Sequence, residues 1–306
     1  MLKLVILIIY FAVLIGIGLY CRKHATDVNG FVLGGRSVGP WLTAFAYGTS
    51  YFSAVVFVGY AGQFGWKYGI AATWAGIGNA IIGSLLAWVV LGRRTRIMSQ
   101  HLDSATMPQY FGKRFGSNPL KIGASVIIFI FLIPYTASLY NGLSRLFGMA
   151  FNIDYSVCII IMATLTAIYV IAGGYMATAI NDFIQGIIML FGIVAVIAAV
   201  IHSKGGFMSA LQGLANVSDP AVSDTPGIFA SFFGPDPFNL LCVVILTSLG
   251  TWGLPQMVQK FYAIDNEASI QKGTVISTIF ALIVSGGCYF LGGFGRLFSD
   301  QIDVKI

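Results

Sequence analysis

The stretch "FAYGTSYFSAVVFVGYAGQFG", residues 45–65, interrupts an apolar segment with glycines and hydroxyl groups. A continuous helix of this length would cross a bilayer. Gly48 stands beside Thr49 and Ser50, with Ser53 close behind, and this cluster predicts a break near the middle of the span. Unpaired backbone groups cost several kcal/mol in lipid, so a broken helix survives only inside protein or beside a water-filled cavity.

A second stretch, "LTSLGTWGLPQMVQ" at residues 246–259, has the same character. It combines helix-breaking residues with polar ones: Gly250, Gly253, Pro255, Thr247, Ser248, Thr251 and Gln256. Paired interruptions five spans apart are typical of secondary transporters with inverted repeats, whose unwound backbone binds ions and solute at the bilayer midplane. For any single hydroxyl, back-bonding to a carbonyl one turn earlier or packing between helices is the alternative.

The composition of the whole chain indicates an integral membrane protein. It has 306 residues, of which 57% are hydrophobic and 9% charged, and a mean hydropathy of +0.85. Apolar runs of membrane-spanning length predict eight helices. Their expected bounds are 3–21, 40–63, 70–92, 122–148, 155–173, 182–202, 238–258 and 273–293. The first run lacks a cleavage site of small residues, so we interpret it as a retained span.

The charges bear on orientation and partners. Most of the 17 Lys and Arg residues fall in loops that are inside if the N-terminus is outside. Eight spans then return the C-terminus to the outside, together with the long loop 203–237 and a short surface helix over 207–214. We therefore interpret the basic residues behind the net charge of +6 as setting the orientation of the chain in a lipid bilayer, and we exclude nucleic acid as a partner.

Four motifs resemble the sodium:solute symporter family, which includes bacterial sodium/proline symporters and sodium/glucose cotransporters. They are "FVLGGRSVGPW" (31–41), "MPQYFGKRFG" (107–116), "GGYMATAINDFIQGIIM" (173–189) and "PQMVQKFYAIDNEASI" (255–270). The resemblance implies an all-α membrane protein with the LeuT-like inverted-repeat fold, in a bacterial inner membrane. It divides the single transmembrane domain 1–306 into an extra helix (1–21), a first five-helix repeat (40–202) and the start of a second repeat (238–306).

Family members are longer, so the resemblance implies a truncated transporter. Sodium in similar transporters lies between backbone carbonyls of the first broken helix, here Thr49 and Phe52, and hydroxyls of a later helix. That helix would follow residue 306. Sodium, a hard cation, requires about five or six oxygen ligands by analogy with other hard ions, so we expect no sodium-driven uptake by this chain without the remaining helices of a longer gene product.

Two ionisable residues are candidates for an ion pathway. The resemblance links Asp182, in "TAINDFIQG", to sodium passage toward the cytosol. The alternative is a helix N-cap, where a carboxylate meets free N–H groups. Arg36, in "GGRS", corresponds to a basic residue near the inner mouth, and a positive-inside anchor is its alternative.

Solute identity is less constrained. The candidate contacts are Tyr51, Ser53, Tyr135, Thr251, Trp252 and Gln256. Tyr135 in "IPYTASLYNG" matches a family aromatic, although buried tyrosines commonly serve packing. Tyr51 replaces an acidic residue of the proline symporters, and Thr247 and Thr251 replace aromatics, so these departures argue against proline.

The function implied is sodium-coupled symport of a small amino acid, sugar or carboxylate by alternating access. No nucleophile, base and orienting group converge in the sequence, so no enzyme activity is expected. Two other hypotheses remain open: a membrane sensor module of a signalling protein, and a non-transporting fragment that lacks the rest of the second repeat.

Overall fold

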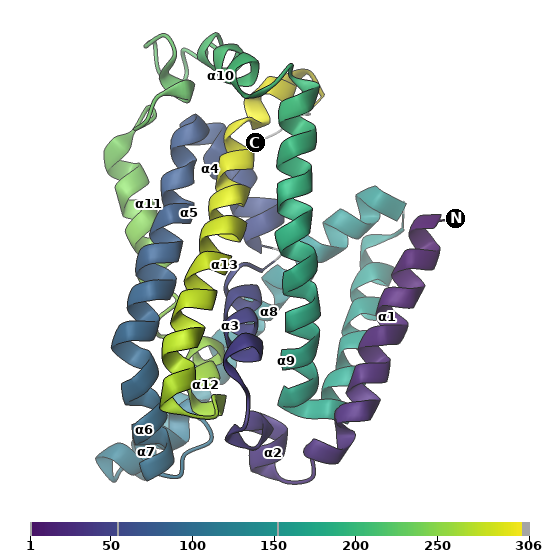
Figure 1. Cartoon of the computed structure of the whole chain (residues 1–306), viewed down its shortest axis with the longest axis vertical. Helices are drawn as coiled ribbons and strands as arrows, with labels where there is room; N and C mark the ends of the chain where they lie inside the picture. The colour runs from purple at the N-terminus through teal and green to yellow at the C-terminus, as the bar shows by residue number, and fades with distance from the viewer. Residues whose placement is uncertain (1, 54, 152, 302–306) are drawn as a thin grey trace. The chain divides into compact units, whose positions relative to one another are not determined.

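A computed structural model describes residues 2–53, 55–151 and 153–301, and these residues form helices joined by connections of different lengths (Figure 1). Within these ranges there are isolated β-bridges but no named strand. The all-helical class predicted from the sequence is confirmed. The chain divides into two compact units, each assembled from three segments that are separate in the sequence.

The first unit consists of Met1–Tyr51, Ala87–Gly186 and Gly253–Ile276. Its helices are α1 (Leu2–Cys21), α2 (Val28–Leu33), α3 (Pro40–Tyr51), α6 (Arg93–His101), α7 (Met107–Phe115), α8 (Asn118–Phe151), α12 (Pro255–Ala263) and the first parts of α9 (Tyr155–Ser203) and α13 (Glu267–Gly293). Helix α12 packs against α2, α3 and α6. The helix that follows the second predicted interruption therefore lies against the helix that precedes the first.

A sharp turn at Gly174 divides α9 into two helical segments, 155–173 and 175–203. Its φ of 57° and ψ of −150° belong to a conformation that glycine adopts readily and other residues rarely. The break predicted between two helical segments is present, but the second segment begins earlier than residue 182. Asp182 consequently lies about two turns inside a helix and not at its start.

The second unit consists of Phe52–Leu86, Ile187–Trp252 and Ser277–Ile306. Its elements are a π-helical segment (Val55–Tyr60), α4 (Ala61–Tyr68), α5 (Thr73–Gly78), a second π-helical segment (Asn79–Leu86), α10 (Phe207–Ala215), α11 (Pro237–Leu249) and the later parts of α9 and α13. Helices α4 and α13 cross closely: a Cβ added at Gly65 would lie only 2.0 Å from the carbonyl carbon of Gly292, so there is no room for a side chain at this point. Small residues at crossings are how membrane helices gain close packing.

Both predicted interruptions are present. Helix α3 ends at Tyr51, residues 52 and 53 are not helical, and a π-helical segment starts at Val55. Helix α11 ends at Leu249 and α12 begins at Pro255. Each interruption falls among the glycines and hydroxyl residues that predicted it.

Among the described residues, four helices are long and apolar enough to span a membrane: Ala61–His101, Asn118–Gly148, Tyr155–Ser203 and Glu267–Gly293. The third contains two of the predicted spans, on either side of Gly174. Val5–Cys21 and Pro237–Leu249 are shorter apolar helices. The remaining predicted span, 40–63, is the one divided by the first interruption.

The long loop after α9 is fastened within its own unit. The short helix predicted over 207–214 is confirmed as α10. Arg296, which is 5% exposed, pairs with Asp219 at 2.9 Å and donates to the carbonyl of Trp66 at 2.5 Å. Its guanidinium also lies 3.8 Å from the ring centroid of Phe229. These contacts tie the loop to helix α4 and to the segment that follows α13.

Candidate functional site

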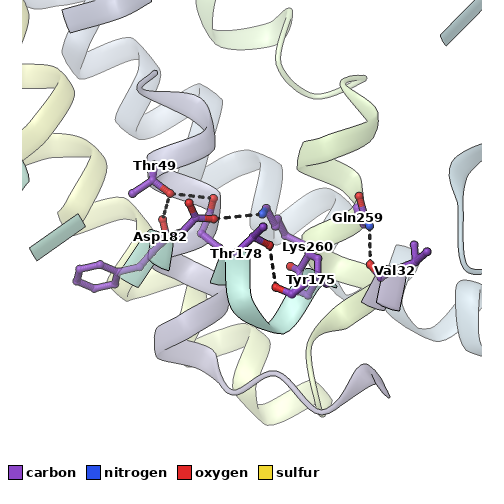
Figure 2. Close-up of polar contacts among 9 residues, drawn as sticks. Val32, Thr49, Tyr175, Thr178, Asp182, Gln259 and Lys260 are labelled. Atoms are coloured by element: carbon purple, nitrogen blue, oxygen red, sulfur yellow. Dashed lines mark hydrogen bonds and ion pairs between the residues drawn. The ribbon is translucent and has the colours of Figure 1, made fainter. Parts of the chain in front are cut away.

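Thr49 stands in the last turn of α3, immediately before the first interruption. Its hydroxyl lies 3.0 Å from the carbonyl oxygen of Phe45 and also within hydrogen-bonding reach of the Asp182 carboxylate (Figure 2). A hydroxyl carries one proton, so it donates to one of these two acceptors at a time. Thr49 can therefore either bond back to the carbonyl one turn earlier in its own helix or donate to the Asp182 carboxylate.

Asp182 projects from the second segment of α9 toward α3 and α12 (Figure 2). Its side chain is 21% exposed, and Oδ2 lies 3.7 Å from Nζ of Lys260. Because Asp182 is well inside the helix, it does not meet the free N–H groups of a helix start. The N-cap interpretation of Asp182 is therefore wrong, and its carboxylate is held by side chains of other helices.

Lys260 is the residue that sequence reasoning missed. It was counted among inner-loop charges that set orientation, but it lies in helix α12, and its side chain is 8% exposed. The ammonium pairs with Asp182 and lies 5.0 Å from the ring centroid of Tyr175. One signal was available in the sequence: Lys260 falls between the apolar residues Met257 and Phe261. In the structure both of these are 1% exposed, so the helix has no fully solvated face there.

Backbone contacts hold α12 in place around this pair. The side chain of Gln259 donates to the carbonyl of Val32 at 2.6 Å (Figure 2). Val38 N–H donates to the carbonyl of Ala263, and the N–H of Asp265 donates to the carbonyl of Val38. The segments 31–41 and 255–270, far apart in the sequence, are thereby joined directly.

Arg36 takes part in the same junction. Its guanidinium donates to the carbonyls of Ser104 at 2.9 Å, Ser99 at 3.4 Å and Tyr262 at 3.4 Å. These bonds connect the loop after α2 to the end of α6 and to α12. The contacts support an anchoring role for Arg36, and its place in an ion pathway stays a prediction.

Three predicted solute contacts lie in the first unit. Tyr51 is 7% exposed and meets Tyr47 edge to face, with ring centroids 6.3 Å apart. Tyr135 is half-buried on α8. Both amide atoms of Gln256 are covered, yet neither makes a hydrogen bond to a described residue. Gln256 is therefore the candidate whose donor and acceptor are both unpaired by the described residues.

The other three lie in the second unit. Ser53 is half-buried within the first interruption, and its carbonyl accepts from Val56 N–H. Thr251 donates to the carbonyl of Ser248 at 3.0 Å, and Trp252 Nε1 donates to the carbonyl of Ile82 at 3.0 Å. Thr251 and Trp252 thus use their donors within the protein. The six candidates are divided between the two units, and their joint role stays a prediction.

Asn79 organises the end of α11 from within the second unit. Its side chain is buried, and Oδ1 accepts from the hydroxyls of Thr247 at 3.0 Å and Ser248 at 3.2 Å. Its Nδ2 donates to the hydroxyl of Ser285 at 3.3 Å. Asn79 therefore fixes the turn of helix that precedes the second interruption, a role that sequence reasoning did not assign.

Among residues 2–53, 55–151 and 153–301, no group of three or more His, Cys, Asp and Glu side chains forms a metal site. At Asp182 the structure instead places one carboxylate beside the Thr49 hydroxyl. Comparison with known proteins gives the context: the model of the sodium:solute symporter family matches residues 31–300. The chain belongs to this family. The similar proteins are transporters and not enzymes, as the sequence indicated.

Relatives of this symporter-family chain carry transporter names. The chain is 29% identical to the osmoregulated proline transporter of Bacillus subtilis, over 97% of this chain and 59% of that protein. It is 30% identical to the sodium/proline symporter of Staphylococcus aureus over 99% of this chain and 58% of that protein. The chain therefore spans about three fifths of the length of these relatives.

The fold is shared with a solved symporter structure. The whole chain superposes, with a TM-score of 0.74 and 16% identity, on 63% of a sodium-coupled sialic acid symporter in a substrate-bound outward-open state. This likeness confirms the LeuT-like fold predicted from the motifs. The family match and the apolar helices together indicate a multi-pass membrane protein.

Proposed function

We propose that this protein acts in sodium-coupled symport of a small organic solute by alternating access in a bacterial inner membrane. The family and the names of its bacterial relatives support this proposal. In such a cycle sodium favours the outward-open state and raises solute affinity. By thermodynamic linkage the solute raises sodium affinity by the same factor.

The observation that carries the proposal is the Asp182 carboxylate beside the Thr49 hydroxyl at the first interruption. Charged side chains within membrane segments are costly, and they commonly mark ion or substrate pathways. Carboxylate and hydroxyl oxygens are hard ligands that suit a hard cation such as sodium. We therefore assign Asp182 and Thr49 to the sodium path toward the cytosol.

The rest of the site follows the family resemblance. Backbone carbonyls of Thr49 and Phe52, on either side of the point where α3 ends, are proposed sodium ligands. The helix whose hydroxyls complete this site in similar transporters is proposed to belong to a longer gene product. Arg36 is proposed to line the inner end of the ion pathway.

The solute contacts are proposed for the six residues named above, with Gln256 as the main polar contact. Its amide presents one donor pair and one acceptor, which suits a hydroxyl, carboxylate or amino group of a solute. Tyr51 and Tyr135 would supply aromatic faces. The relatives' names favour an amino acid, whereas the replacements at positions 51, 247 and 251 argue against proline.

The test uses proteoliposomes that contain the full gene product and a panel of radiolabelled amino acids, sugars and carboxylates. We expect at least one solute to accumulate in sodium and not in choline. Asp182→Asn should lower that uptake roughly tenfold or more, since the ion path loses its charge. Asp27→Asn is the matched control, because asparagine caps α2 as well as aspartate does. Equal uptake in sodium and choline for every solute would refute the proposal.

A further inference from the structure

The Lys260 ammonium is the one cation that the structure pairs with Asp182 among the described residues. Both side chains are largely shielded, at 8% and 21% exposure. A carboxylate in such surroundings requires a nearby positive charge, because an unpaired buried charge is strongly destabilising. Lys260 supplies that charge in the structure, at the place where the proposed function puts sodium.

The pair is loose. Its N–O distance of 3.7 Å exceeds the roughly 2.7–2.9 Å of a charge-assisted hydrogen bond. The carboxylate has about four lone-pair sites, and Thr49 and Lys260 do not fill them. The geometry thus leaves the carboxylate oxygens of Asp182 able to bind a second, more compact cation.

Lys260 also has an alternative place for its charge. The ammonium already lies 5.0 Å from the ring centroid of Tyr175, within the range of a cation–π interaction. Its four-carbon stem is flexible, whereas the backbone of α12 is held by the bond from Gln259 to Val32. Movement of the side chain from Asp182 toward the Tyr175 ring would therefore not require movement of the helix.

We propose that Lys260 is a tethered competitor of sodium: its ammonium neutralises Asp182 when the ion is absent and moves aside when the ion binds. This inference rests on the proposed function, because it takes Asp182 to be on the sodium path. Two unit charges a few ångströms apart repel strongly at a shielded site, so the ammonium and the ion exclude each other. Return of Lys260 to Asp182 would then promote release of sodium toward the cytosol.

The experiment measures equilibrium binding of ²²Na⁺ to the purified full gene product in detergent, at about pH 8, where an ordinary carboxyl is ionised. We expect Lys260→Met to raise sodium affinity about tenfold, because the competing charge is gone. Lys260→Arg should lower affinity several-fold, since the guanidinium binds a carboxylate with two parallel bonds and stays charged. Lys272→Met, at an exposed lysine of α13, should change nothing.

The outcomes separate this inference from the proposed function. If Asp182→Asn abolishes sodium binding but both Lys260 variants bind as the wild type does, the ion pair is structural and the inference is wrong. If Lys260→Met does not fold, Lys260→Arg decides: unchanged or tighter binding would overturn the inference. If Asp182→Asn binds sodium normally, the ion path assigned to Asp182 fails as well.

Discussion

Replacement of Asn79 by leucine tests whether buried polar bonds hold the end of α11. The substitution keeps a similar side-chain size and removes the bonds to Thr247, Ser248 and Ser285. Hydrogen bonds between membrane helices contribute about 0.6 kcal/mol on average, so loss of the bonds to Ser248 and Ser285, and of the one for which Thr247 has an alternative acceptor, predicts a loss of about 1–2 kcal/mol in the free energy of unfolding. Thr247 keeps its bond to the carbonyl of Val243, whereas the hydroxyls of Ser248 and Ser285 remain buried.

The measurement is unfolding by SDS in mixed micelles, followed by tryptophan fluorescence. Ser84→Ala provides the comparison, because it removes one buried bond, to Ser277 at 2.8 Å, and should cost about 0.6 kcal/mol. Asn79→Leu should therefore destabilise the protein about two to three times as much. A loss no greater than that of Ser84→Ala would show that the Asn79 bonds do not stabilise this end of α11.

Three further results are expected. Single cysteines introduced in the loop 203–237 should react with an impermeant thiol reagent in intact cells, and reaction only after permeabilisation would reverse the topology. Ser53→Ala should weaken solute affinity in the full gene product by about 0.5–1.5 kcal/mol, through loss of a hydrogen bond, whereas Ser50→Ala should change it less; equal effects would place both hydroxyls in packing roles. Hydrogen bonds from Asn239, first from its side chain and second from its backbone N–H, hold the pKa of Asp236 below its ordinary value. Asp236→Ala should therefore lower the melting temperature at neutral pH, and this difference should shrink as the pH falls through the ordinary carboxyl pKa and toward the lowered one. A difference that persists in acid would assign the effect to something other than the charged cap.

The sequence by itself determined where the helices are interrupted. Glycine, proline and hydroxyl residues interrupt the backbone hydrogen-bond ladder through local conformational preference, so both interruptions were predictable. The separate spans around Gly174 followed from the apolar runs on either side of it, and the short helix α10 was predicted from its own stretch of sequence. The four family motifs indicated the fold, because their residue patterns are themselves contiguous in the chain.

Only the tertiary structure decided which polar groups meet. Lys260 looked like a loop charge, and Asp182 like a helix cap, because neither residue's neighbours in the sequence reveal its partner. The tertiary structure brings Lys260 of α12 to Asp182 of α9, and packing of α11 against the second π-helical segment brings Thr247 to Asn79. Such pairs lie far apart in the chain and depend on how helices pack, which local composition does not encode.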